Sequence, residues 1–181
     1  MKRAFMFAIH ARSIRFVALA SLFTVHCSLF TVPAQDDEPI PPPPIIVTKE
    51  ERQKLDAQTD TKERVKLSID LMDARLTVAE KFSTAQDFEL MFRELGGFHG
   101  LLDNAMERLE RQSGSDRKVL DNYKRYSLGI RGFATRLEVI RRDIPLQYED
   151  YVRKLLIHIR DLQTKAAEPF FKNTVVPNQK P

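Results

Sequence analysis

Apolar side chains recur at helical spacing along most of the chain. In segment 60–82 they stand alternately four and three residues apart, at Val65, Ile69, Met72, Leu76 and Ala79. Side chains with this spacing lie on one face of an α-helix. Sustained alternation of apolar and polar residues and hairpin turn dipeptides, which would indicate strands, are missing. The pattern therefore predicts an all-α fold.

Three further long helices follow from the same pattern. One is expected over 85–111, and a second over 116–144, where strict four–three spacing is typical of knobs-into-holes packing. A third is expected from Pro145 to Ala167, because proline suits the first turn of a helix and Pro169 would stop it. A short helix over 49–57 is predicted by the capping-box pair Thr48 and Glu51.

Short connections between long helices make neighbouring helices antiparallel. The predicted architecture is therefore an up-down four-helix bundle, over residues 48–168, with a short extra N-terminal helix. A helical-hairpin repeat, or solenoid, is the alternative. Residues 169–181 are expected to form a C-terminal tail, because they lack helical periodicity.

The N-terminal segment has the pattern of a secretory signal peptide over residues 1–34. Basic residues come first, an apolar run spans 16–30, and Val32-Pro33-Ala34 suits cleavage before Gln35. The run is shorter than the roughly 20 apolar residues of a membrane span, so no stable span is expected after cleavage. We expect a periplasmic or extracellular protein; anchoring in the inner membrane by an uncleaved signal is the alternative.

Residues 35–47 contain four consecutive prolines, Pro41 to Pro44. Such a run favours an extended backbone without internal hydrogen bonds. This segment is therefore expected to be a disordered linker between the signal peptide and the bundle.

Removal of the signal peptide changes the charge of the chain. The whole sequence has a net charge of +4, but residues 1–34 contribute four basic and no acidic residues. Residues 35–181 therefore contain 25 basic and 25 acidic residues and have no net charge. A nucleic-acid-binding domain needs a basic surface, so no nucleic-acid partner is expected. The single cysteine, Cys27, also leaves with the signal peptide. Thiolate metal sites, disulfides and covalent haem attachment are thereby excluded.

Candidate chemistry is sparse after residue 34. The only histidines there are His99 and His158, and neither follows a glutamate by three residues, as a di-iron carboxylate bundle requires. Acidic residues such as Asp103 are mostly out of phase with the apolar stripes and are interpreted as solvent-facing. No catalytic residue or cofactor is predicted, and His99 and His158 are the only candidate metal ligands.

Five of the six glycines lie inside predicted helices, where each costs about 1 kcal/mol relative to alanine. The glycines between 96 and 100 indicate either the close approach of a neighbouring helix or a kink or break; because the apolar stripe keeps its phase across them, a continuous but weakened helix is expected. The glycines also suggest a groove for a partner or an apolar ligand, lined by Gly96, Gly97, Phe98, Gly100, Gly129, Gly132 and Phe133.

Two functional hypotheses follow. The first is an exported, non-enzymatic module of the cell envelope, either structural or acting through a protein partner or self-association. The alternative is a bundle that binds a small molecule or a metal. It predicts either that His99 and His158 converge with an acid or a methionine, or that the glycine cluster opens an apolar pocket.

Overall fold

The computed structural model describes residues 40–112 and 116–172. Over these ranges the chain forms helices and no strands, which confirms the all-α class. The expected signal peptide (1–34), the start of the expected linker and residues 173–181 of the expected tail lie outside the described residues. No helix in the described part is long and apolar enough to cross a membrane.

The first three helices are α2 (Lys49–Asp56), α3 (Thr61–Thr84) and α4 (Phe88–Glu110). Each begins at a side chain that satisfies a free backbone N–H. The Thr48 hydroxyl accepts from Glu51 N at 3.2 Å, while the Glu51 carboxylate accepts from Thr48 N at 2.9 Å. Asp60 and Asp87 cap α3 and α4. The glycines of α4 do not break it.

The helix expected over 116–144 is divided in two, which corrects the prediction. Helix α5 (Arg117–Ile130) and helix α6 (Phe133–Asp143) are separated by a turn at Arg131 and Gly132. Both turn residues keep right-handed helical dihedral angles. The apolar stripe therefore stays in phase across the break, and the sequence pattern could not reveal it.

Helix α7 (Leu146–Lys172) extends beyond the expected end at Ala167 and contains Pro169. A proline inside a helix removes one hydrogen bond and crowds the preceding turn. Here it affects only the last turn that the structure describes. The expected boundary between bundle and tail at 168/169 was therefore placed too early.

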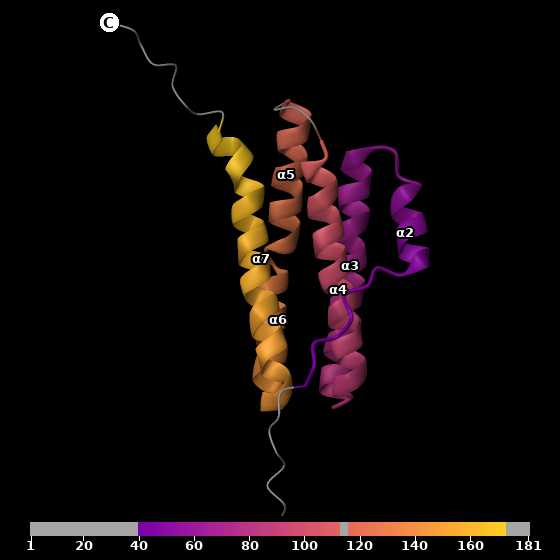
Figure 1. The fold of residues 1–181 in the computed structure, drawn as a ribbon, viewed down its shortest axis with the longest axis vertical. Coiled ribbons are helices and arrows are strands. Elements are labelled where there is room, and N and C mark those ends of the chain that lie inside the picture. Colours follow the sequence, from indigo (N-terminus) through magenta and orange to yellow (C-terminus); the bar gives the residue numbers. More distant parts are fainter. Residues whose placement is uncertain (1–39, 113–115, 173–181) are drawn as a thin grey trace, which may run out of the picture. The chain divides into compact units, whose positions relative to one another are not determined.

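Figure 1 shows α4 running alongside α3, and α7 running alongside α5 and α6. The core between them is made of fully buried apolar side chains, and the Tyr126 hydroxyl donates to the Leu102 carbonyl oxygen at 3.1 Å within it. The largest of these side chains include Tyr126, Phe98, Met72, Leu76, Leu95, Leu102, Ile130 and Leu137. Burial of such side chains is the main favourable term in folding.

Two arginines tie the helices together at the edge of the core. Arg75 on α3 donates to Glu51 on α2 at 2.8 Å and to Glu94 on α4 at 2.6 Å. Arg136 on α6 donates to Asp73 and Glu80 on α3, at 2.5 and 2.6 Å. Polar contacts thus fix how α2, α4 and α6 lie against α3.

Residues 40–47 form an ordered strap rather than the expected disordered linker. The strap begins with a backbone hydrogen bond from Ile40 N to the Gln147 carbonyl oxygen (3.4 Å) and crosses α4 on its way to α2 (Figure 1). Pro43 is buried, and Ile40 and Val47 pack against the core. The expectation failed because it considered only the local stiffness of the proline run, and not the surface of α4 on which that run lies.

Candidate metal centre

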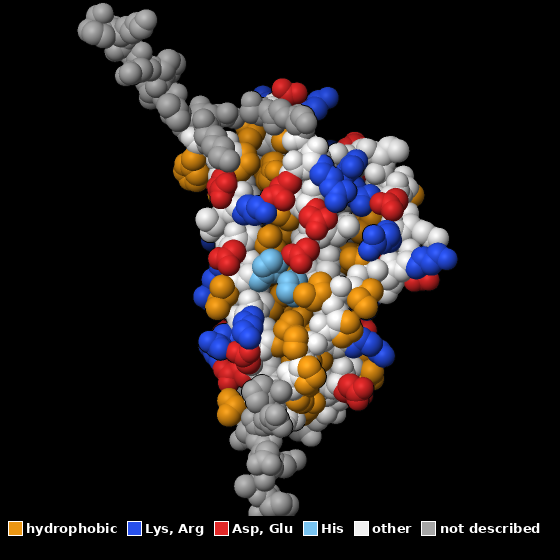
Figure 2. Space-filling model, in the orientation of Figure 1, with side chains coloured by type: hydrophobic (Ala, Val, Ile, Leu, Met, Phe, Trp, Pro, Cys, Tyr) orange, Lys and Arg blue, Asp and Glu red, His pale blue; other side chains and the backbone are white. Residues whose placement is uncertain are grey.

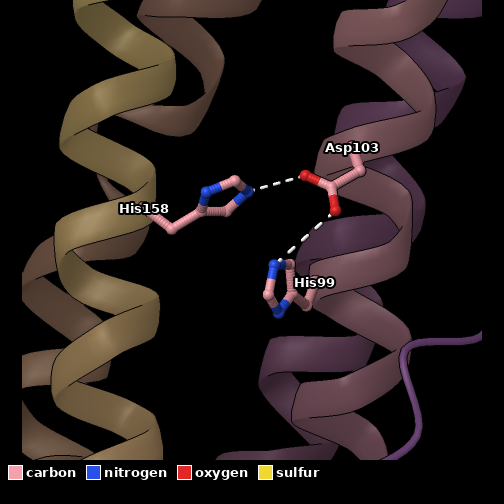
Figure 3. A group of neighbouring side chains, drawn as sticks. All are labelled: His99, Asp103 and His158. Carbon is pink, nitrogen blue, oxygen red and sulfur yellow. Dashed lines mark hydrogen bonds and ion pairs between the residues drawn. The ribbon is translucent and has the colours of Figure 1, made fainter.

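Three potential metal ligands meet where α4 packs against α7. His99 and Asp103 stand four residues apart on α4, which places them on the same helix face one turn apart. His158 reaches toward them from α7 (Figure 3). One ring nitrogen from each histidine and one carboxylate oxygen all lie within 4.8 Å of one another.

The two histidines contact opposite oxygens of the same carboxylate. His158 Nε2 lies 2.6 Å from Asp103 Oδ1, which is a hydrogen bond. His99 Nε2 lies 3.6 Å from Asp103 Oδ2, which is longer than a hydrogen bond. The two imidazole rings lie 4.6 Å apart, centroid to centroid.

The cluster is open on one side. The side chains of His99, Asp103 and His158 are 15 %, 38 % and 32 % exposed. Figure 2 shows the histidines, in pale blue, at the surface beside acidic side chains. All three side chains are therefore partly accessible to solvent.

The same carboxylate affects the two histidines differently. Its hydrogen bond raises the pKa of His158, against the opposing effect of burial. Burial lowers the pKa of His99; the charge of Asp103 opposes that shift, and His158 adds to it. In the metal-free protein His158 is thus the histidine that holds a proton more readily. When His158 is protonated, it forms an ion pair with Asp103 that joins α4 to α7.

Tyr151 lies behind His99 at the buried side of the cluster. Its hydroxyl oxygen is 3.3 Å from His99 Nδ1 and 3.4 Å from the Leu95 carbonyl oxygen. The Tyr151 ring also packs edge-on against Phe92, which in turn packs against Tyr148. A row of aromatic rings along α4 and α7 therefore supports the buried side of His99.

Two imidazole nitrogens and one carboxylate oxygen are donors that suit divalent late first-row ions such as Zn²⁺, Ni²⁺ and Cu²⁺. Tetrahedral Zn²⁺, with bonds of about 2.0–2.1 Å, needs donor atoms about 3.3 Å apart. The three donor atoms lie within 4.8 Å of one another, so binding would draw them closer together and would open the 2.6 Å hydrogen bond between His158 and Asp103. Three protein donors leave at least one coordination position for water or another ligand.

The residues of the groove expected from the sequence do not line one common space. A Cβ atom at Gly96 would lie 2.4 Å from the Pro44 carbonyl oxygen, and one at Gly100 would lie 3.2 Å from the backbone of Ile46. The strap therefore fills the space beside these two glycines. Gly97 faces the Arg75 guanidinium.

The other expected groove residues belong to the core or to open surface. Gly129 faces the Ile69 side chain, while a Cβ atom at Gly132 would meet no neighbouring heavy atom within 4 Å. Phe98 and Phe133 are buried and pack edge-to-face, 5.4 Å apart. The chain itself therefore fills the space beside Gly96, Gly97, Gly100 and Gly129, whereas the space beside Gly132 is open.

Sequence reasoning identified both histidines but missed Asp103 and Tyr151. The i, i+4 spacing of His99 and Asp103 was visible, but it is common on solvated helices. Only the meeting with His158, which lies 55 residues beyond Asp103, distinguishes this carboxylate from its neighbours. Comparison with protein-family models, with curated proteins and with solved structures gives no significant match for this chain.

Proposed function

We propose that this protein is an exported helical-bundle protein that binds one divalent transition-metal ion between α4 and α7, and that it acts as a binding module rather than as an enzyme. The observation that carries the proposal is the convergence of His99, Asp103 and His158, with their donor atoms within 4.8 Å of one another. No local sequence pattern requires residues so far apart to meet.

An ion pair between Asp103 and His158 would need only two of these side chains. The third, His99, brings a second imidazole against His158, with ring centroids 4.6 Å apart. Within 40–112 and 116–172, His99 and His158 are the only histidines, and both lie in this one cluster. A metal ion gives a reason for both rings to be there, since neutral imidazole is among the commonest metal ligands.

The donor set determines the class of ion. Mg²⁺ and Ca²⁺ prefer sites made of oxygen donors, whereas two imidazoles favour Zn²⁺, Cu²⁺ or Ni²⁺. Because the chain after residue 34 has no cysteine, the site has no soft thiolate donor. We therefore expect Zn²⁺ and Cu²⁺ to bind more tightly than Mn²⁺, and Mg²⁺ not to bind.

The proposal includes export of the protein and the topology of its bundle. Helices α3 and α4, the α5–α6 pair and α7 form an up-down four-helix bundle, with α2 as an extra helix. Residues 1–34 act as a signal peptide, which is supported by the basic start, the apolar run and the cleavage pattern of the sequence. On this view the metal site faces the periplasm or the exterior. Mass spectrometry of the protein from an envelope fraction should find an N-terminus at Gln35.

Titration calorimetry of the purified protein with Zn²⁺, and the visible spectrum of the Co²⁺ form, test the metal site. We expect one ion per chain. His99→Gln, Asp103→Asn and His158→Gln should each weaken binding at least tenfold, about 1.4 kcal/mol. Glu107→Gln is the matched control, since Glu107 lies one turn further along α4 and pairs with Arg111 on the surface. Undetectable binding, or equal binding by all four variants, would overturn the proposal.

A second candidate function is protein–protein contact or self-association. The observation in its favour is a set of exposed apolar side chains on α5, α6 and α7, namely Leu128, Val139, Leu146 and Ile157. Sedimentation analysis and capture from an envelope extract would test it. A monomer at all concentrations that retains no envelope protein would count against this candidate without affecting the metal site.

A further inference from the structure

Tyr151 contacts one of the two ring nitrogens of His99, Nδ1, while the other, Nε2, faces Asp103. Tyr151 comes from α7, is only 8 % exposed and lies on the buried side of the cluster. Its hydroxyl group has two neighbours, the Leu95 carbonyl oxygen at 3.4 Å and His99 Nδ1 at 3.3 Å. Buried tyrosine hydroxyls normally use such partners, because an unpaired polar group is costly there.

The two partners differ in what they can do. A carbonyl oxygen only accepts hydrogen bonds, and a phenol has one proton to donate. If the Tyr151 proton is donated to Leu95, the phenol oxygen can only accept from His99, so His99 Nδ1 must carry the ring proton. A neutral imidazole has a single ring proton, so Nε2 is then left with a lone pair.

Nε2 is also the nitrogen that faces the other two donors. Figure 3 shows one ring nitrogen of His99 turned toward Asp103 and the other turned away. His99 Nε2 stands 3.6 Å from Asp103 Oδ2, which is longer than a hydrogen bond, whereas the other carboxylate oxygen, Oδ1, accepts from His158 at 2.6 Å. The geometry is thus compatible with a lone pair at Nε2.

We infer that Tyr151 is the positioning residue of the metal site, holding His99 in the tautomer whose Nε2 lone pair points toward Asp103 and His158. This inference rests on the proposed metal-binding function for its purpose, although the hydrogen bond itself exists without metal. Groups that orient a ligating histidine commonly change metal affinity by about 10- to 100-fold when removed. Tyr151 supplies this orientation from a helix other than the one that carries His99.

Nitrogen-15 NMR of histidine-labelled, metal-free protein tests the tautomer directly, at a pH where His99 is neutral. We expect Nδ1 to be protonated and Nε2 unprotonated in the native protein. In Tyr151→Phe, which keeps the ring and loses only the hydroxyl, His99 should become a mixture of both tautomers, and Zn²⁺ affinity should fall about tenfold. Tyr148→Phe is the matched control, because the Tyr148 ring packs on Phe88 and Phe92 in the same aromatic row. This variant should change neither the tautomer of His99 nor the Zn²⁺ affinity.

The outcomes separate this inference from the proposed function. A native His99 protonated at Nε2 would overturn the inference whether or not metal binds. Zn²⁺ affinity that is the same in Tyr151→Phe as in the native protein would remove the positioning role and leave the metal site standing. A His99 tautomer that depends on Tyr151, in a protein that binds no metal, would refute the proposed function and leave only the hydrogen bond.

Discussion

At the scale of single residues, two glycines of α4 show how a missing side chain can be a structural requirement. Gly96 and Gly100 lie where the strap crosses the helix, and the strap backbone occupies the positions next to their absent Cβ atoms. Glycine weakens a helix by about 1 kcal/mol relative to alanine. The close contact with the strap, which buries Pro43, gives a physical reason why α4 tolerates this cost.

Substitution of Gly96 by alanine should therefore destabilise the protein in spite of the better helix propensity. The new Cβ would lie 2.4 Å from the Pro44 carbonyl oxygen, a backbone atom that cannot yield unless the strap lifts. Overpacking of this kind costs about 1–3 kcal/mol, more than the gain of about 1 kcal/mol in propensity. We expect a lower free energy of unfolding in urea and faster proteolysis within 40–47. A variant as stable and as protease-resistant as the native protein would contradict the packed strap.

At the scale of secondary-structure elements, the division between α5 and α6 has little effect on packing. Ile130 and Phe133 flank the turn, and both are buried, as are Leu137 and Ile140 further along. Arg131 and Gly132 keep helical dihedral angles, so the two helices present one apolar stripe to α3 and α7. The turn thus interrupts hydrogen bonding without turning the stripe away from the core.

Gly132→Ala should stabilise this region, in contrast to Gly96→Ala. No heavy atom lies within 4 Å of the new Cβ position, and φ is −72°, which any residue adopts easily. Replacement of glycine at a compatible position gains about 0.4–1 kcal/mol, which corresponds to a rise of about 1–4 °C in Tm for a protein of this size. Thermal unfolding followed by circular dichroism measures it. An unchanged or lower Tm would show that the turn needs glycine.

At the scale of the whole folded unit, the metal-free cluster acts as a pH-dependent link between α4 and α7. The hydrogen bond to Asp103 raises the pKa of His158 above its ordinary value of 6.5. A raised pKa in the folded state means that the link stabilises the fold fully below the unfolded-state pKa and is lost as the pH rises through the folded-state value. Burial lowers the pKa of His99 and so favours its neutral ring. The contribution of His99 to stability is therefore present at high pH and is lost as the pH falls.

Urea unfolding in the presence of a chelator should reveal this link. We expect the free energy of unfolding of the native protein to exceed that of the His158→Gln variant by the largest amount below about pH 6.5. This difference should shrink as the pH rises above that value. His99→Gln should show the reverse trend, because protonation of the partly buried native ring is unfavourable at low pH. A margin for His158→Gln that is constant or grows with pH would show that the ion pair does not contribute in this way.

The local elements were predictable because their determinants are local. Apolar spacing placed α3, α4 and α7 within a few residues of their observed starts, and the Thr48–Glu51 pair marked the start of α2. Caps and amphipathic stripes depend only on residues three or four positions apart. The same locality explains the errors: a turn with helical dihedral angles leaves the stripe unchanged, and Pro169 looks like a stop although the helix continues through it.

The all-α class, the starts of most helices and the two histidines available as ligands thus follow from the order of residues along the chain. Tertiary packing was needed to place the strap on Gly96 and Gly100, and to bring His158 to Asp103 and His99. These contacts join residues about fifty or more positions apart, and they depend on which turns of α4 and α7 lie side by side. That register is set by the packing of the whole core, so it cannot be predicted from any short stretch of the sequence.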